Sequence, residues 1–113
     1  MTEGLRWRIT KAVRASDLPA PARLIMLVLA DVAEVGTAEI PERFTPSLTV
    51  LANETGLDRS TVKRHLNALD EAGWLERKQP DAAAQWRGER TRYRLTLPVG
   101  APNTLGADEA HPG

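Results

Sequence analysis

The sequence contains no cysteine and only two histidines, which excludes disulfides, thiolate metal sites and thiol nucleophiles. His65 and His111 have no evident catalytic or metal-binding partner in the sequence. The acidic pair at 70–71 falls on a predicted helix surface, and the pair at 108–109 falls in a polar tail. We therefore expect no enzyme activity, no catalytic residues, no metal site and no cofactor.

Long apolar segments are also missing. The longest strongly apolar run, Leu24 to Ala30, is far shorter than the roughly 18 to 20 residues that cross a bilayer. The first residues show neither the apolar core nor the small-residue cleavage site of a secretion signal. These absences predict a cytoplasmic protein that does not associate with membranes.

The chain carries no net charge, which by itself argues against a nucleic-acid partner, because proteins that bind phosphate usually have a basic surplus. The charges are unevenly distributed, however. Residues 5–14 hold four basic and no acidic side chains, and residues 59–94 hold nine basic and five acidic ones, whereas residues 15–58 have a net charge of −5. Since salt screens charges beyond about 8 Å, a local basic surface matters more to a phosphate than the total charge does. The charge pattern is therefore compatible with DNA binding.

Hydrophobic periodicity predicts one mainly helical domain over residues 18–97, between an N-terminal basic extension (1–17) and a flexible tail (98–113). The extension can form a basic amphipathic helix over residues 5–15. The first helix of the domain should span about residues 20–35, with prolines in its first turn and Gly36 at its end. We expect most of its circumference to be buried, because apolar side chains occupy so many of its positions. They are Leu24, Ile25, Met26, Leu27, Val28, Leu29 and Val32.

Two shorter helices are predicted after a loop at residues 36–44, which has an extended piece near 42–45. Thr45 or Ser47 can cap a helix that runs to about residue 55, and Gly56 can make the turn after it. Asp58 can cap a helix that runs to about residue 72, where Gly73 ends it. The inward stripe of this second helix is formed by Val62, Leu66 and Leu69.

After Gly73 the periodicity changes to that of a two-stranded hairpin. Residues 74–78 look extended, and residues 91–97 alternate between apolar and polar positions. The connection over residues 79–90 is polar and predicts a long loop. Trp86 is unusual in such a segment, because a large aromatic side chain there must fold back onto the core, meet a partner or lie against DNA, and we expect the first of these.

The segment from Leu51 to Leu66 has the small Ala52 where two helices would cross, Gly56 at the turn, and Leu57 and Val62 in the angle between the helices. This segment, followed by Gly-Trp-Leu and a hairpin, resembles the winged helix-turn-helix proteins of bacteria over roughly residues 18–97. The resemblance implies a mainly α fold with a small β-hairpin, in which a three-helix core carries a wing. It also implies binding to double-stranded DNA.

The helix that begins near residue 59 would enter the major groove, where Arg and Lys can reach guanine edges and Asn can pair with adenine. Its outward face carries the candidate base contacts Arg59, Lys63, Arg64 and Asn67 and the candidate phosphate contacts Ser60 and Thr61. The resemblance gives the basic residues of the wing a role at phosphates or in the minor groove. These are Arg87, Arg90, Arg92 and Arg94.

Three functions fit this pattern. The first is a transcription regulator, and the second is a plasmid or phage protein of replication, partition or excision, because the segment from Leu18 also looks like the DNA-binding domain of a replication initiator. The third is a protein-interaction module without DNA binding, which the neutral charge leaves open. A homodimer that binds two half-sites about 34 Å apart is expected, and the N-terminal segment can alternatively pack against a second copy. No small-molecule effector can be inferred.

Overall fold

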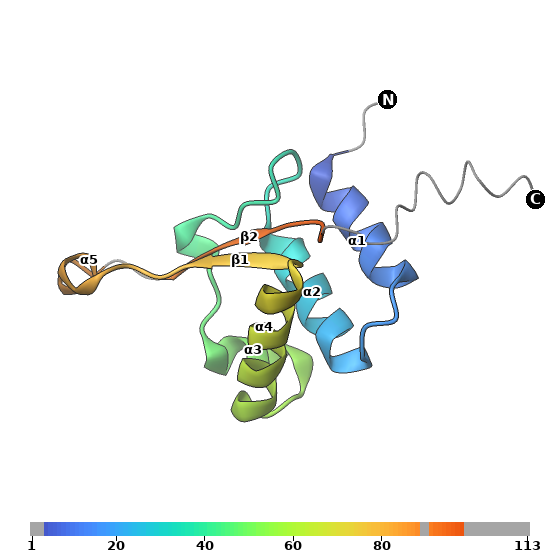
Figure 1. Ribbon diagram of the computed structural model, residues 1–113. Helices are drawn as coiled ribbons and strands as arrows, with labels where there is room; N and C mark the ends of the chain where they lie inside the picture. Colours follow the sequence, from blue (N-terminus) through green and yellow to red (C-terminus); the bar gives the residue numbers. More distant parts are fainter. Residues whose placement is uncertain (1–3, 89–90, 99–113) are drawn as a thin grey trace, which may run out of the picture.

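The computed structural model describes residues 4–88 and 91–98, and it shows the predicted mainly helical fold with one antiparallel hairpin (Figure 1). Three helices, α2, α3 and α4, surround the core, α1 packs on α2, and the hairpin extends from one side. The elements are α1 (Leu5–Ala15), α2 (Ala20–Val32), the 3₁₀ helix η1 (Glu42–Phe44), α3 (Leu48–Thr55), α4 (Arg59–Ala72), β1 (Leu75–Lys78), α5 (Ala82–Trp86) and β2 (Arg92–Leu95). None of the helices in the described residues is long and apolar enough to cross a bilayer.

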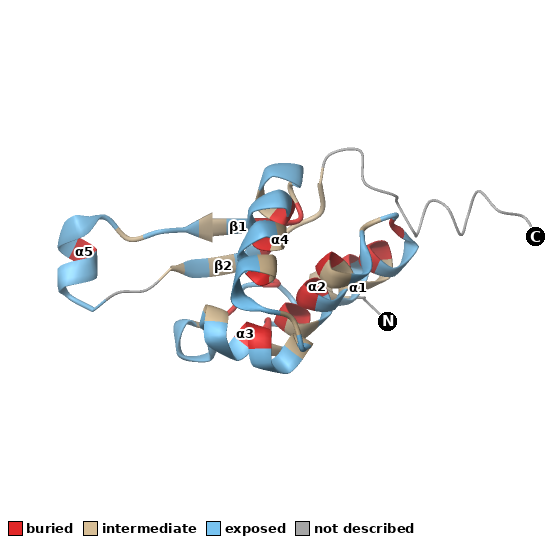
Figure 2. Cartoon of the chain, turned by 90° about the horizontal axis from the view of Figure 1, so that it is seen from below, coloured by how far each residue is buried: buried red, intermediate tan, exposed pale blue. Residues whose placement is uncertain are grey.

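The hydrophobic core joins all four long helices to the hairpin. Its largest buried side chains come from α1 (Ile9, Val13), α2 (Ile25, Met26, Leu29), α3 (Leu51), α4 (Val62, Leu66, Leu69), the hairpin (Leu75, Leu95) and the segment before η1 (Ile40). Figure 2 shows these buried positions on the sides of the helices that face one another. The N-terminal basic segment is thus a helix whose apolar side packs on its own chain.

Helix α2 differs from the prediction in length and in the side that it buries. It ends at Val32, because Ala33 has extended backbone and the following residues form a turn that receives the start of α1. There the backbone N–H of Arg6 donates to the Val35 carbonyl at 3.1 Å, and Nη1 of Arg6 donates to the Ala33 carbonyl at 3.1 Å. These tertiary contacts end the helix before Gly36 is reached.

The expectation that α2 is buried over most of its circumference is wrong. Ile25, Met26 and Leu29 are buried, whereas Leu24 and Leu27 are 37% and 38% exposed. Helices α1, α3 and α4 all contact α2, but together they do not surround it. One apolar strip of α2 therefore remains in contact with solvent.

The caps of α3 and α4 follow the sequence pattern. The side chain of Ser47 accepts from the Val50 N–H at 3.1 Å and begins α3, and that of Asp58 accepts from the Thr61 N–H at 2.7 Å and begins α4. Gly56 and Gly73 end the two helices with φ of 76° and 89°, a conformation that costs glycine little because it has no Cβ. The angle between the two helices is thus set by residues at their ends.

The hairpin pairs Leu75 with Leu95 and Lys78 with Arg92 at its two ends, as an antiparallel ladder. A third segment joins its edge, because the Ile40 N–H donates to the Tyr93 carbonyl and the Leu95 N–H donates to the carbonyl of residue 38. The extended piece therefore lies around residue 39. The prediction of an extended piece at 42–45 is wrong, since residues 42–44 form η1.

Residues 75–88 and 91–95, called the wing here, project away from the helices, and α5 lies at the far end (Figure 1). The predicted loop thus contains a short helix, which Asp81 caps by accepting from the Ala84 N–H at 2.8 Å. Trp86 does not fold back onto the core: it is 91% exposed, and Ala84 is the buried residue of α5. The length of the wing keeps Trp86 away from the helices.

Candidate nucleic-acid interface

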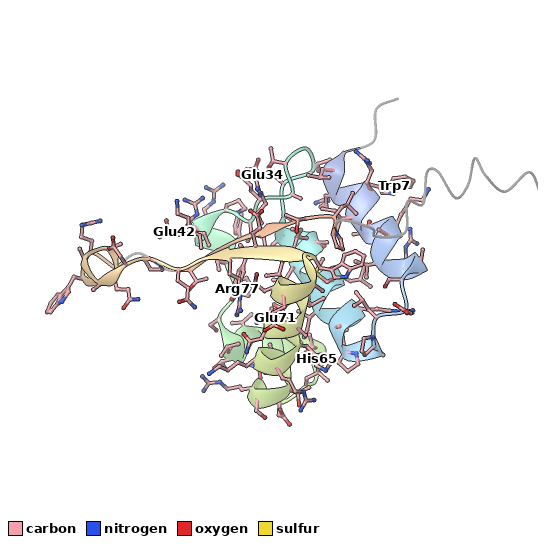
Figure 3. The ribbon with its side chains drawn as sticks, in the orientation of Figure 1. Trp7, Glu34, Glu42, His65, Glu71 and Arg77 are labelled. Atoms are coloured by element: carbon pink, nitrogen blue, oxygen red, sulfur yellow. The ribbon has the colours of Figure 1, made fainter. Side chains whose placement is uncertain are left out.

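Helix α4 exposes one continuous polar face. Because Val62, Leu66 and Leu69 point into the core, the helical period places the predicted base contacts on the opposite side. All of them are exposed: Arg59, Lys63, Arg64 and Asn67, together with Ser60. Three cations and two polar side chains thus share one face of a helix that has the dimensions to enter a major groove. The acidic Glu71 lies at the C-terminal end of this face (Figure 3).

The N-terminus of α4 is occupied by its own cap. The Ser60 hydroxyl donates to Asp58 Oδ1 at 3.0 Å, and the Thr61 N–H donates to the same oxygen. The hydrogen bonds from Thr61, followed by that from Ser60, lower the pKa of Asp58. A carboxylate therefore already fills the position at the helix end that favours anions. Ser60 and Thr61, predicted as phosphate contacts, hold this cap in the free protein.

Arg77, which the sequence pattern did not single out, links the wing to α4. Its Nε lies 2.9 Å from Asp70 Oδ2, and its Nη2 donates to Asn67 Oδ1 at 2.8 Å. Figure 3 shows Arg77 between β1 and α4. The signal for it is the inward register of β1: Arg77 pairs with Tyr93, on the same side of the hairpin as the buried pair of Leu75 and Leu95.

The outer side of the hairpin carries four charged residues in two cross-strand pairs. Arg94 Nη2 lies 2.7 Å from Glu76 Oε1, so one predicted DNA contact forms an ion pair within the wing. The next pair consists of Lys78 and Arg92, two cations directly opposite each other and both exposed. Like charges in this position destabilise a hairpin unless an anion lies nearby. Lys78 was not among the predicted contacts.

Two other predicted wing contacts lie farther along the chain. Arg87 follows α5 and is exposed at the tip. Arg90 lies outside the described residues. An open groove of about 930 Å³ runs along the wing, and its lining includes Arg77 and Tyr93 of the hairpin and Asp70 of α4. Burial raises the pKa of Tyr93 above its ordinary value of 10.0, so its hydroxyl stays protonated at neutral pH.

The second basic block of the sequence lies elsewhere. It occupies α1, which packs on α2 on the side of the molecule opposite the tip of the wing (Figure 1). In this block Arg6 donates to a carbonyl of the turn after α2, and Lys11 Nζ lies 4.4 Å from the centre of the Trp7 ring. The two basic blocks therefore do not form one surface.

The histidine and acidic side chains of the described residues do not suggest a metal site. His65 is half-buried on α4. In the described part of the chain no three acidic or histidine side chains gather to hold a metal ion.

Comparison with known proteins agrees with this architecture. A family described as a helix-turn-helix domain matches residues 16–75, from the end of α1 to the start of β1. Neither the curated proteins nor the solved structures gave a significant match. The match supports DNA binding in general, and it covers more than half of the chain. This chain therefore belongs to the helix-turn-helix domain family.

Proposed function

We propose that the protein is a transcription regulator that binds specific sequences of duplex DNA, with α4 in the major groove. The observation that carries this proposal is the outward face of α4, where Arg59, Lys63 and Arg64 stand beside Asn67 and all are exposed. Arg and Lys donate to guanine O6 and N7, and Asn can bond to base edges in the same groove. Specific recognition needs side chains of this kind that reach the edges of the bases, in addition to contacts with phosphates.

In this proposal the wing binds the sugar-phosphate backbone beside the groove that α4 occupies. A phosphate near Lys78 and Arg92 would relieve the repulsion between the two cations and gain two charge-assisted contacts. Arg87 and Trp86, at the tip, would reach the neighbouring minor groove or backbone. Arg94 contributes less in this arrangement, because Glu76 offsets its charge.

The proposal includes a homodimer. Leu24 and Leu27 leave an apolar strip of α2 exposed, and a second copy could cover it. Two copies would place two α4 helices on half-sites about one turn of DNA apart, which raises affinity beyond that of a single module. In this proposal the protein acts by binding DNA, without catalysis.

Selection of bound sequences from a random duplex pool, at about 0.15 M salt, tests this function. A single palindrome with half-sites about one helical turn apart would support a dimeric regulator. An array of direct repeats would favour a protein of replication or partition instead. Failure to enrich any sequence would refute specific recognition, and failure to retain any duplex would favour a protein-interaction module.

A further inference from the structure

The side chain of Asn67 is fixed by an arginine of the wing. Arg77 reaches from β1 to α4, where its Nη2 donates to Asn67 Oδ1 at 2.8 Å and its Nε bonds to Asp70 Oδ2 at 2.9 Å. The Arg77 side chain is only 20% exposed. The two bonds use different nitrogens of one rigid, planar group, so Asp70 fixes the guanidinium that in turn holds Asn67.

This contact defines which end of the Asn67 carboxamide faces outward. A guanidinium has five N–H donors and no acceptor, so only the carboxamide oxygen can face it favourably. The amide nitrogen, with its two donors, must then point away from Arg77. Asn67 lies one turn after Lys63 on the exposed face of α4, where its nitrogen is available to DNA.

We infer that Arg77 is a positioning residue that makes Asn67 a hydrogen-bond donor toward DNA, and that Asn67 thereby selects guanine. This inference rests on the proposed function. In the major groove, guanine presents the acceptors O6 and N7, and an amide N–H can donate to either of them, whereas adenine presents the N6 amino donor beside its N7 acceptor. The bidentate pair of asparagine with adenine instead needs both the oxygen and the nitrogen, and here the oxygen is directed at Arg77.

Rotation of the amide toward the adenine arrangement would be costly. It would turn the amide N–H groups toward the guanidinium and place donors against donors. Arg77 could not follow the oxygen, because Asp70 holds its other arm. The choice between guanine and adenine at this position therefore depends on a residue that need not touch a base.

The test is selection from a random duplex pool with the wild type and three variants. The wild type should enrich guanine over adenine at one position by about fivefold, the low end of the range for a base contact, and Asn67→Ala should lose that preference. Arg77→Lys keeps the positive charge but cannot bond to Asp70 and Asn67 in the same fork. It should bind random duplex as the wild type does, while adenine becomes as acceptable as guanine at that position. Arg92→Gln, the control on the other side of the wing, should weaken binding to all sequences and leave the base preference unchanged.

Several outcomes would overturn the inference. Enrichment of adenine that depends on Asn67 would show that the carboxamide rotates, and an unchanged guanine preference in Arg77→Lys would show that Arg77 does not position it. If Arg77→Lys does not fold, Asn67→Asp serves instead, because it keeps an acceptor for Arg77 and removes both donors. Persistence of the guanine preference in Asn67→Asp would contradict the inference. A wild type that enriches no sequence overturns the proposed function as well, which distinguishes the two failures.

Discussion

Lys78 and Arg92 lie directly opposite each other on the two strands of the wing, and both side chains are exposed. Directly paired residues have Cβ atoms about 4.5–5.5 Å apart, and like charges in such pairs oppose the hairpin. If the flexible side chains hold their charges about 8 Å apart in water, the repulsion is about 0.5 kcal/mol. Replacement of both residues by glutamine should therefore raise the free energy of unfolding by a few tenths of a kcal/mol.

The same double variant should bind DNA less well. Each phosphate contact contributes about 0.9 to the slope of log K against log salt concentration, so loss of two contacts should flatten the slope by about 1.8. If the counterion-release contribution to affinity is taken as zero at about 1 M salt, each lost contact lowers the affinity about fivefold at about 0.15 M salt. Loss of both contacts then lowers it roughly 30-fold. The structure thus predicts opposite effects of Lys78→Gln with Arg92→Gln on folding and on binding.

Urea unfolding measures the first effect, and fluorescence anisotropy of a labelled duplex between about 50 mM and about 200 mM salt measures the second. The matched control is Glu76→Gln with Arg94→Gln, which removes the neighbouring ion pair without changing the charge of the wing. This control should leave the slope close to that of the wild type. An unchanged slope in the first double variant would show that the wing does not contact phosphate.

Three further results are expected. The hydrogen bonds from Thr61 lower the pKa of Asp58, so its charged form stabilises the fold above the ordinary value of 3.8 and loses this effect as the pH falls through the lowered pKa. Between about pH 5 and about pH 2 the melting temperature of the wild type should therefore fall more than that of Asp58→Asn, and equal falls would refute this. Trp86→Phe should abolish the change in tryptophan fluorescence that DNA induces, whereas Trp7→Phe should keep it. A fluorescence change that persists in Trp86→Phe would show that the tip of the wing does not contact DNA. Leu27→Glu should give a monomer by light scattering with little change in melting temperature, because Leu27 is 38% exposed, and a wild type that is already monomeric would contradict the proposed dimer.

Local signals were sufficient for α3 and α4. Their ends depend on residues that act within a few positions, such as Ser47 and Asp58 at the starts and Gly56 and Gly73 at the ends. The inward stripe of α4 also follows from helical spacing alone. The helix-turn-helix could therefore be predicted from the sequence together with the side of α4 that faces solvent.

Features that depend on contacts between distant segments could not be predicted in this way. Seven apolar side chains in α2 look alike in the sequence, and only the positions of α1, α3 and α4 decide that Leu24 and Leu27 stay exposed. Trp86 was expected to be buried because it is large and apolar, but the wing extends too far for it to reach the core. The bond between Arg77 and Asn67 joins residues ten positions apart on different elements, and it requires the relative placement of α4 and β1.

The pairing of charges explains how a chain without net charge can present a basic surface to DNA. Three acidic residues of the segment 58–76 are engaged within the protein: Asp58 caps α4, Asp70 bonds to Arg77, and Glu76 bonds to Arg94. Each of these carboxylates is thereby held beside an N–H donor or a cation, which partly offsets its negative charge. The exposed cations that face the proposed groove and backbone are Arg59, Lys63, Arg64, Lys78, Arg87 and Arg92. Since phosphates respond to charges within about one Debye length, the affinity for DNA should depend on these six residues rather than on the net charge of the chain.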